Sequence, residues 1–295
     1  MPESLYGQHI RDSLRSRMRE VGARPRQEFI VGLALTAALL VAACATQVSS
    51  PSFPSLYLPP VDRPGSFSSV ASPSVPITGH LYRPPGDRRF AAVVLLHGGH
   101  GVHDYAFAWA TWLRSERYVA LVVDSLGSRA PGEKRIWGGR RGVSLNDMAA
   151  DAYGAMAYLG TLPFVDPDRI ALMGWSQGGA AAFTAVDPTG RVASAYPRAP
   201  GFRAVIGVYP HCEPLALSTR VPILLLLGTE DYVTSLCLQG AARMREERKP
   251  VRVKTYTGAK HGFDQEPWIE VYDAIATADA RGQVRGFLWE YLDPR

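Results

Sequence analysis

From about residue 78 onward, short apolar runs recur along the chain and longer amphipathic segments separate them. The runs have the length and the β-branched content of buried strands. They lie at residues 91–96, 118–123, 169–173, 204–208, 221–227 and 251–256. Residues 144–162 repeat Met148, Ala152, Met156 and Leu159 at helical spacing. Alternating strands and helices predict an α/β fold with a mostly parallel central sheet and helices on both faces, and residues 78–82 add a candidate edge strand.

The composition excludes several classes of protein. With 46% apolar and 20% charged residues in 295, the chain is not disordered throughout, and it is long enough for one large α/β domain with appendages. The net charge of +5 is modest, and the basic residues do not interleave with aromatic ones as they do on a nucleic-acid surface. We therefore expect no nucleic-acid partner.

The first part of the chain has the layout of an export signal. Residues 29–43 form an apolar run preceded by Arg24 and Arg26, and the run is short for a membrane span. It ends in "VAAC", which resembles the lipobox of bacterial lipoproteins, with Cys44 as the acylated residue. An uncleaved anchor, or ordinary cleavage after Ala45, fits the same residues. Each interpretation exports the folded part of the chain, and lipidation or anchoring holds it at a membrane.

Three segments follow from this pattern. Residues 1–44 form the export or lipoprotein signal, and residues 45–76, rich in serine and proline, are expected to be an extended tether. Residues 77–295 form the folded domain. In an oxidising compartment Cys212 and Cys237, each just after a predicted strand, are expected to pair in a disulfide, although two separate buried thiols remain an alternative.

One glycine-rich bend stands where a predicted strand gives way to a helix. Residues 174–178 read Gly-Trp-Ser-Gln-Gly, a G-x-S-x-G pattern. Glycines at both ends allow a sharp turn that presents the Ser176 hydroxyl at the top of the sheet, which is the geometry of a nucleophile elbow. The alternative is that Ser176 only caps the following helix.

A serine nucleophile needs a base and a group that orients the base. Asp231 follows the strongest predicted strand, and His261 follows the next one. The order Ser176, Asp231, His261 is the order found in α/β-hydrolases. Asp124, which ends an earlier strand, and Glu230 are the alternative acids.

The loop after the first buried strand reads His97-Gly98-Gly99-His100. The backbone N–H of Gly99, together with that of Gln177, is expected to form an oxyanion hole, although a simple strand-ending turn would also use these glycines. His100 is expected to border the substrate pocket. His97, His100, His103 and Asp104 do not make a convincing metal site, because no further ligands accompany them in this glycine loop.

A basic loop follows the strand at 118–123. Arg129 in this loop is a candidate for binding a substrate carboxylate, and a solvated loop is the alternative. Trp109, Trp137, Trp175 and Trp268 either line an apolar pocket or pack in the core, as tryptophan more often does.

Several of these motifs together resemble those of a known protein family. In "HGGHG", "VVDSLGSR", "VDPDRIALMGWSQGG", "LLLGTEDYVT" and "KHGF" the chain resembles the dienelactone hydrolase family of α/β-hydrolases. Dienelactone hydrolases proper use a cysteine where this chain has Ser176, and they place a glutamate near the oxyanion loop, where residues 93–102 have none. The resemblance implies a hydrolase without a cofactor that acts on small-molecule esters or lactones, closer to a general carboxylesterase with an acyl-enzyme on Ser176.

Two other functions stay open at this point. The same triad would serve a peptidase or an esterase of acetylated sugars. A catalytically silent envelope protein that binds a ligand is the alternative outside enzymology, although a binding protein has no need of all three triad residues. The oligomeric state does not follow from the sequence.

Overall fold

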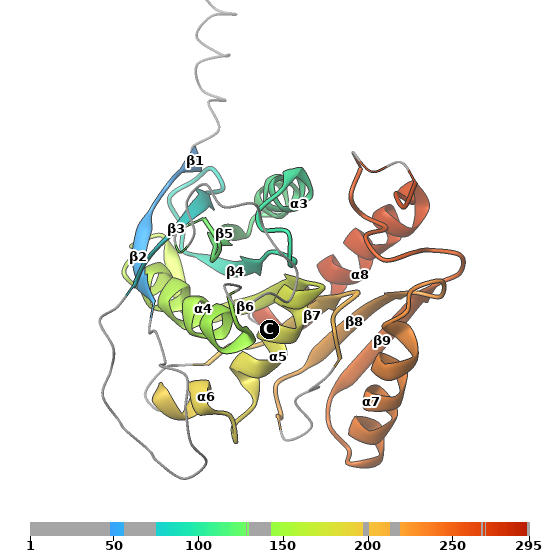
Figure 1. Ribbon diagram of the computed structural model, residues 1–295. Coiled ribbons are helices and arrows are strands. Elements are labelled where there is room, and N and C mark those ends of the chain that lie inside the picture. Colours follow the sequence, from blue (N-terminus) through green and yellow to red (C-terminus); the bar gives the residue numbers. More distant parts are fainter. Residues whose placement is uncertain are drawn as a thin grey trace, which may run out of the picture. The chain divides into compact units, whose positions relative to one another are not determined.

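A computed structural model describes residues 48–55, 75–127, 129, 143–196, 201–212, 219–266, 268 and 270–293. Within these residues, nine strands form one sheet (Figure 1). They are β1 (Val48–Ser49), β2 (Ser52–Ser55), β3 (Val75–Tyr82), β4 (Phe90–Leu96), β5 (Val119–Asp124), β6 (Val165–Trp175), β7 (Val205–Val208), β8 (Ile223–Gly228) and β9 (Val251–Tyr256).

The strands follow the order β1-β3-β5-β4-β6-β7-β8-β9, and β2 also pairs with β3. The six strands from β5 to β9 in this order are parallel, whereas β3 runs antiparallel to β5. Leu96 of β4 pairs with Gly174 of β6, and Gly228 of β8 pairs with Tyr256 of β9. The carboxyl ends of these strands therefore meet at one edge of the sheet.

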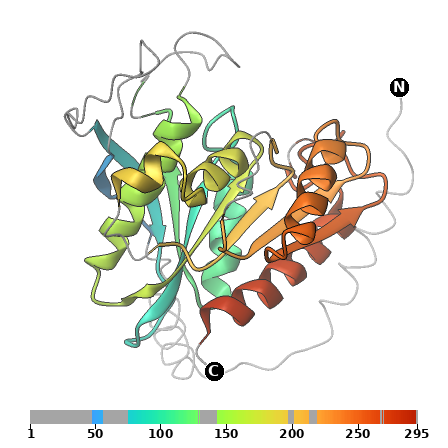
Figure 2. The same ribbon diagram turned by 90° about the horizontal axis from the view of Figure 1, so that it is seen from below.

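Helices cover both faces of the sheet, as the alternating pattern predicts. They are α3 (Asp104–Ser115), α4 (Leu145–Gly160), α5 (Gln177–Val186), α6 (Arg191–Ala195), α7 (Thr234–Glu246) and α8 (Ala274–Leu292). Figure 2 shows α3 and α8 on one face and α4, α5 and α7 on the other. Arg285 of α8 donates to Glu116 just after α3 at 2.7 Å, and Tyr153 of α4 donates to the Ala185 carbonyl of α5 at 2.9 Å.

Burial explains why the central strands read as continuous apolar runs. Every residue of β4 and of β8 is buried, because helices pack on both sides of these strands. Helix α4 begins where the sequence predicts it: Ser144 accepts the N–H of Asp147, and the Asp147 side chain accepts the N–H of Ser144. This reciprocal capping box satisfies backbone donors that the first turn leaves unpaired.

The expectation of an extended tether over residues 45–76 is wrong for part of that segment. Strands β1 and β2 both pair antiparallel with β3, so β3 is not the edge strand that the pattern indicates. Phe53 of β2 is 2% exposed and stacks on Tyr158 of α4, with 5.7 Å between ring centroids. A single aromatic side chain and the ladder of β3 hold a segment whose composition alone reads as unstructured. Pro54 is tolerated because β2 lies at an edge.

Residues 1–47, which include the apolar run at 29–43 and Cys44, lie outside the described residues. Among the described residues, no helix combines the length and the apolar character needed to cross a bilayer.

Replacing Phe53 by alanine should destabilise the folded domain by about 3–5 kcal/mol, because the change removes a buried ring and leaves a cavity between β2 and α4. Urea unfolding of the full chain measures this loss. Val48→Ala is the matched control, since Val48 is 43% exposed on β1. A loss below about 1 kcal/mol for Phe53→Ala would show that residues 48–55 are a tether after all.

Candidate active site

Four loops meet at the carboxyl edge of the parallel strands. Ser176 directly follows β6, Asp231 lies three residues beyond β8, His261 follows β9, and Gly98 follows β4. Strand ends in an open α/β sheet are where ligands bind, because the loops there converge while the strands stay rigid. The backbone N–H of Glu230 donates to the Ala259 carbonyl at 3.0 Å, so the loops of Asp231 and His261 are joined directly.

The backbone of Ser176 has a conformation that L-residues rarely adopt, with φ 51° and ψ −115°. The two flanking glycines make this turn possible. A Cβ on Gly174 would lie 2.2 Å from the Gly178 carbonyl oxygen, and a Cβ on Gly178 would lie 2.3 Å from the Leu96 carbonyl oxygen. Both approaches are closer than any real Cβ contact, so only glycine fits. Ser176 makes no side-chain cap for α5, and its geometry is that of a nucleophile elbow.

The three side chains expected to form a triad lie in one chain of hydrogen bonds. His261 Nε2 is 2.9 Å from Ser176 Oγ, and His261 Nδ1 is 2.8 Å from Asp231 Oδ2. The buried Asp231 also accepts the backbone N–H of Val233 through Oδ1 at 3.2 Å. A carboxylate at Nδ1 favours the tautomer with the proton on that nitrogen, which leaves the Nε2 lone pair facing the hydroxyl.

The alternative acids lie elsewhere. Asp124 accepts the N–H of Gly127 at 2.8 Å and so closes its own turn after β5, and Glu230 is exposed. Neither makes a hydrogen bond to His261 in the described residues, whereas Asp231 does.

The glycine loop after β4 lies against the elbow. A Cβ on Gly98 would be 3.6 Å from the Cβ of Ser176. The N–H of Gly98 donates to the Tyr105 hydroxyl at 2.9 Å, so this amide is engaged. Gln177 is the first residue of α5, where backbone N–H groups have no acceptor within the helix. The side-chain amide of Gln177 is engaged elsewhere, because it donates to the Val143 carbonyl at 2.9 Å.

Aromatic rings surround the imidazole of His261. The ring of Tyr209 lies 4.8 Å away, that of Tyr232 5.2 Å and that of His211 6.0 Å, measured between centroids. Burial, and then the neighbouring His261, lower the pKa of His211, which keeps this ring neutral near neutral pH. Sequence reasoning missed Tyr209 and His211. The signal is their position, because both residues directly follow the predicted strand at 204–208.

The other histidines lie on the loop after β4. His97 is buried and its Nδ1 lies 2.7 Å from the Gly98 carbonyl, whereas His100 is exposed. The rings of His100 and His103 face Trp268, at 6.1 and 6.2 Å between centroids. In the described part of the chain, no group of three His, Cys, Asp or Glu side chains is placed to hold a metal ion.

The expectation that Arg129 receives a substrate carboxylate needs correction. Both terminal nitrogens of Arg129 donate to the fully buried Asp151 on α4, at 2.6 and 2.8 Å, and one of them also donates to the Ser125 carbonyl. The Arg129 side chain is only 13% exposed. A carboxylate within the protein already binds the guanidinium, so this arginine connects the turn after β5 to α4.

A disulfide joins Cys212 to Cys237, as expected from the sequence, with 5.0 Å between their Cα atoms. Cys212 lies on the loop after β7, next to His211, and Cys237 lies in the first turns of α7, which begins three residues after Asp231. The crosslink therefore connects the loop that carries His211 to α7, the helix that follows Asp231 in the chain.

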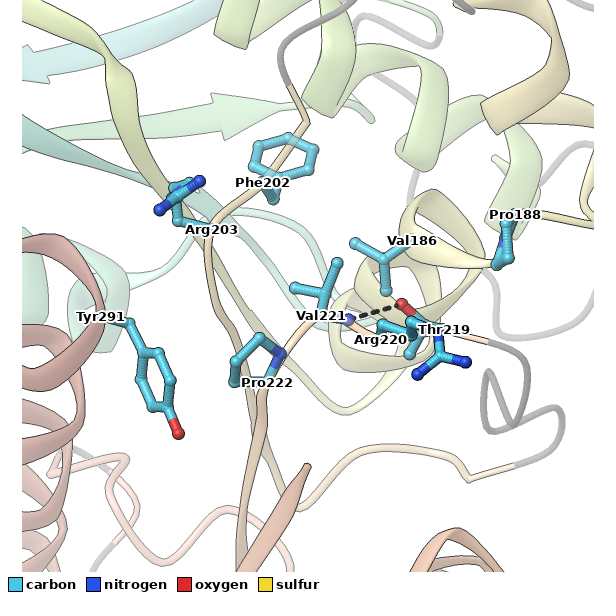
Figure 3. A pocket seen from close by; sticks show the side chains of 9 residues that line it. All are labelled: Val186, Pro188, Phe202, Arg203, Thr219, Arg220, Val221, Pro222 and Tyr291. Carbon is cyan, nitrogen blue, oxygen red and sulfur yellow. Dashed lines mark hydrogen bonds between the residues drawn. The ribbon is translucent and has the colours of Figure 1, made fainter. Parts of the chain in front are cut away.

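A separate cavity of about 660 Å³ lies away from these residues (Figure 3). Phe202 and Arg203 line it just before β7, and Val221 and Pro222 line it just before β8. It therefore opens at the amino ends of the strands, opposite to Ser176.

A nucleophile elbow after one parallel strand, with an aspartate and a histidine after later ones, defines an α/β-hydrolase. The sequence matches the dienelactone hydrolase family over residues 77–292, and the chain belongs to this family. It is thus a hydrolase that acts on ester bonds.

Individual relatives agree with this assignment. The chain is 26% identical over 223 residues to a probable 2-oxo-3-(5-oxofuran-2-ylidene)propanoate lactonase of a Bradyrhizobium species, covering 68% of this chain and 84% of that protein. Two solved structures share the fold. A putative dienelactone hydrolase from Klebsiella pneumoniae has a TM-score of 0.62 at 15% identity, over 82% of this chain and all of that one. Thermogutta terrifontis esterase 2, phosphorylated by paraoxon, has 0.58 at 21% identity, over 74% and 91%.

Gly178→Ala should destabilise the protein by about 1–3 kcal/mol, because the added methyl group collides with the carbonyls of Leu96 and His97. Gly282→Ala is the control. It adds the same methyl group in α8, where no atom other than the local helix backbone lies within 4 Å, so it should raise stability by up to about 1 kcal/mol. Thermal unfolding of both variants tests this prediction. If Gly178→Ala were as stable as Gly282→Ala, the elbow geometry would be contradicted.

Arg129→Ala should cost about 3–5 kcal/mol of stability, because it leaves Asp151 buried without its charged partner. Among folded molecules, KM should change by the same factor for an anionic ester and for a neutral ester of equal size. A selective rise in KM for the anionic ester would instead restore Arg129 as a substrate-binding residue.

Proposed function

We propose that the protein is a serine carboxylesterase that cleaves small ester or lactone substrates through an acyl-enzyme on Ser176. The observation that carries this proposal is the hydrogen-bonded chain from Ser176 Oγ through His261 to Asp231, with separations of 2.9 and 2.8 Å. These distances lie within the range in which a base can take the proton of a nucleophile.

In the first step, Ser176 Oγ attacks the carbonyl carbon of the ester while His261 Nε2 takes the hydroxyl proton. Asp231 stabilises the imidazolium that forms and holds the ring in the required orientation. Negative charge develops on the carbonyl oxygen. The backbone N–H groups of Gly99 and Gln177 are proposed to donate to it, since the neighbouring amide of Gly98 is engaged by Tyr105.

In the second step, the bond from the carbonyl carbon to the leaving oxygen breaks, and His261 gives its proton to that oxygen. The alcohol leaves and the acyl group stays on Ser176; in a lactone both belong to one molecule. Water then attacks the acyl carbon while His261 takes a proton from the water. The bond between this carbon and Ser176 Oγ breaks, and His261 returns the proton to Ser176 Oγ. The products are an acid and an alcohol, and no cofactor takes part.

The names of relatives and the identity of the nucleophile support small esters and lactones as substrates. The Bradyrhizobium relative is named as a probable lactonase, and Thermogutta esterase 2 is an esterase. Ser176 replaces the cysteine of dienelactone hydrolases proper, which favours general esters over dienelactones. His100, exposed beside Trp268 on the loop next to the elbow, is proposed to contact the substrate.

The same proposal includes export and attachment to a membrane through Cys44. The apolar run at residues 29–43 and the following "VAAC" support it. The disulfide between Cys212 and Cys237 also supports it, since disulfides persist in oxidising compartments outside the cytosol.

Ser176→Ala should lower kcat for p-nitrophenyl acetate and butyrate on the order of 10⁶-fold, because the nucleophile is lost while the fold is retained. The variant should also fail to react with a fluorophosphonate probe. Ser194→Ala, which removes an exposed hydroxyl on α6, is the matched control and should keep full activity.

A wild-type protein inert to both esters and to the probe would overturn the esterase proposal and favour a ligand-binding protein. Activity on peptides or acetylated sugars that exceeds activity on simple esters, and that is lost in Ser176→Ala, would keep the triad and replace the substrate class.

A further inference from the structure

A buried carboxylate lies directly behind the triad and takes no part in the steps above. Asp264 is 4% exposed and stands three residues after His261. Its Oδ2 accepts the indole N–H groups of Trp109 and Trp175, both at 2.7 Å, and its Oδ1 bonds to the Tyr209 hydroxyl. The three partners come from three elements: α3, the last residue of β6, and the residue after β7.

The partners of Asp264 favour its charged form. An indole N–H can only donate, so Oδ2 is an acceptor twice. The Tyr209 oxygen accepts the side-chain N–H of Gln265 at 3.1 Å, which leaves its own proton to be donated to Oδ1. Burial raises the pKa of Asp264, and these hydrogen bonds act in the opposite direction. Three donated hydrogen bonds satisfy a carboxylate, whereas the proton of a neutral acid would point at one of these donors.

Two of the three partners touch the triad. Trp175 is bonded covalently to Ser176 and is the last residue of β6, within the G-x-S-x-G elbow. The ring of Tyr209 packs against the imidazole of His261, at 4.8 Å between centroids. Tyr209 also has a positive φ of 35°, so both Ser176 and Tyr209 hold backbone conformations that need support from their surroundings.

We propose that Asp264 is a positioning residue that sets the distance between Ser176 Oγ and His261 Nε2, by holding Trp175 below the elbow and Tyr209 beneath the imidazole. This inference rests on the proposed function, in which that pair transfers a proton. The carboxylate acts through its partners and does not itself contact the reacting atoms. Because Asp264 belongs to the same loop as His261, its three hydrogen bonds also fix that loop to β6 and α3.

The test compares three variants of the full chain. Asp264→Asn keeps the shape but places an amide N–H₂ opposite donors, and Tyr209→Phe removes one of the three donors while it keeps the ring on His261. Tyr153→Phe is the matched control, since Tyr153 also donates from a buried hydroxyl, to the Ala185 carbonyl, away from the triad.

For p-nitrophenyl acetate, kcat should fall about 100-fold in Asp264→Asn and by a smaller factor in Tyr209→Phe, while KM changes less than about threefold. Tyr153→Phe should keep the wild-type kcat even where its stability falls. Wild-type kcat in both test variants, or an equal loss of kcat in the control, would reject the positioning role. Tyr209→Phe decides the question if Asp264→Asn does not fold.

Crystal structures of the same variants separate this inference from the esterase proposal. The distance from Ser176 Oγ to His261 Nε2 is 2.9 Å in the wild type and should lengthen beyond hydrogen-bonding range in the test variants. An inert wild-type protein would overturn the esterase proposal alone, because this distance can still be measured. An unchanged distance in both variants would overturn the role of Asp264.

Discussion

The turn at Ser176 is the constraint on which the remaining structure depends. Its φ of 51° and ψ of −115° place a non-glycine residue in a region that costs about 1–3 kcal/mol, and such a residue persists only where its surroundings determine it fully. Gly174 and Gly178 permit the approach of β6, α5 and the loop after β4 to within distances that no Cβ allows. The register of the parallel strands then brings the other loops to the same edge.

Hydrogen bonds and a disulfide connect the loops around this turn, which are distant in sequence. The Glu230 N–H to the Ala259 carbonyl joins the acid and histidine loops, and the disulfide joins the loop after β7 to α7. Asp264 adds a third connection, to the elbow itself through Trp175. All three segments that carry the triad are thus held by interactions that are independent of the reacting atoms. An enzyme that relies on hydrogen-bond distances near 3 Å benefits from such preorganisation.

Membership of the dienelactone hydrolase family defines the kind of reaction but not the substrate. The family match over residues 77–292 establishes the fold and ester-bond chemistry. The solved relatives, at 15% and 21% identity, establish that the fold is shared. The family match does not define which ester is cleaved. Among the described residues, the exposed Tyr232 packs against the ring of His261, and the exposed His100 packs against Trp268.

The sequence by itself determined the α/β fold, the elbow at Ser176 and the order of Asp231 and His261. Apolar periodicity and glycine spacing are local properties, and each triad residue follows a predicted strand in the sequence. Tertiary structure decided the rest. Residues 48–55 look unstructured in composition, but they gain strand structure from β3 and burial of Phe53 from α4. The sequence suggests that Arg129 is available to a substrate. In the structure its guanidinium is paired with Asp151 of α4, the next helix along the chain. Asp264 reads as an ordinary polar residue in a loop. Only packing places it among two indoles and a phenol, because the cost of burying a carboxylate is met by donors from three distant parts of the chain.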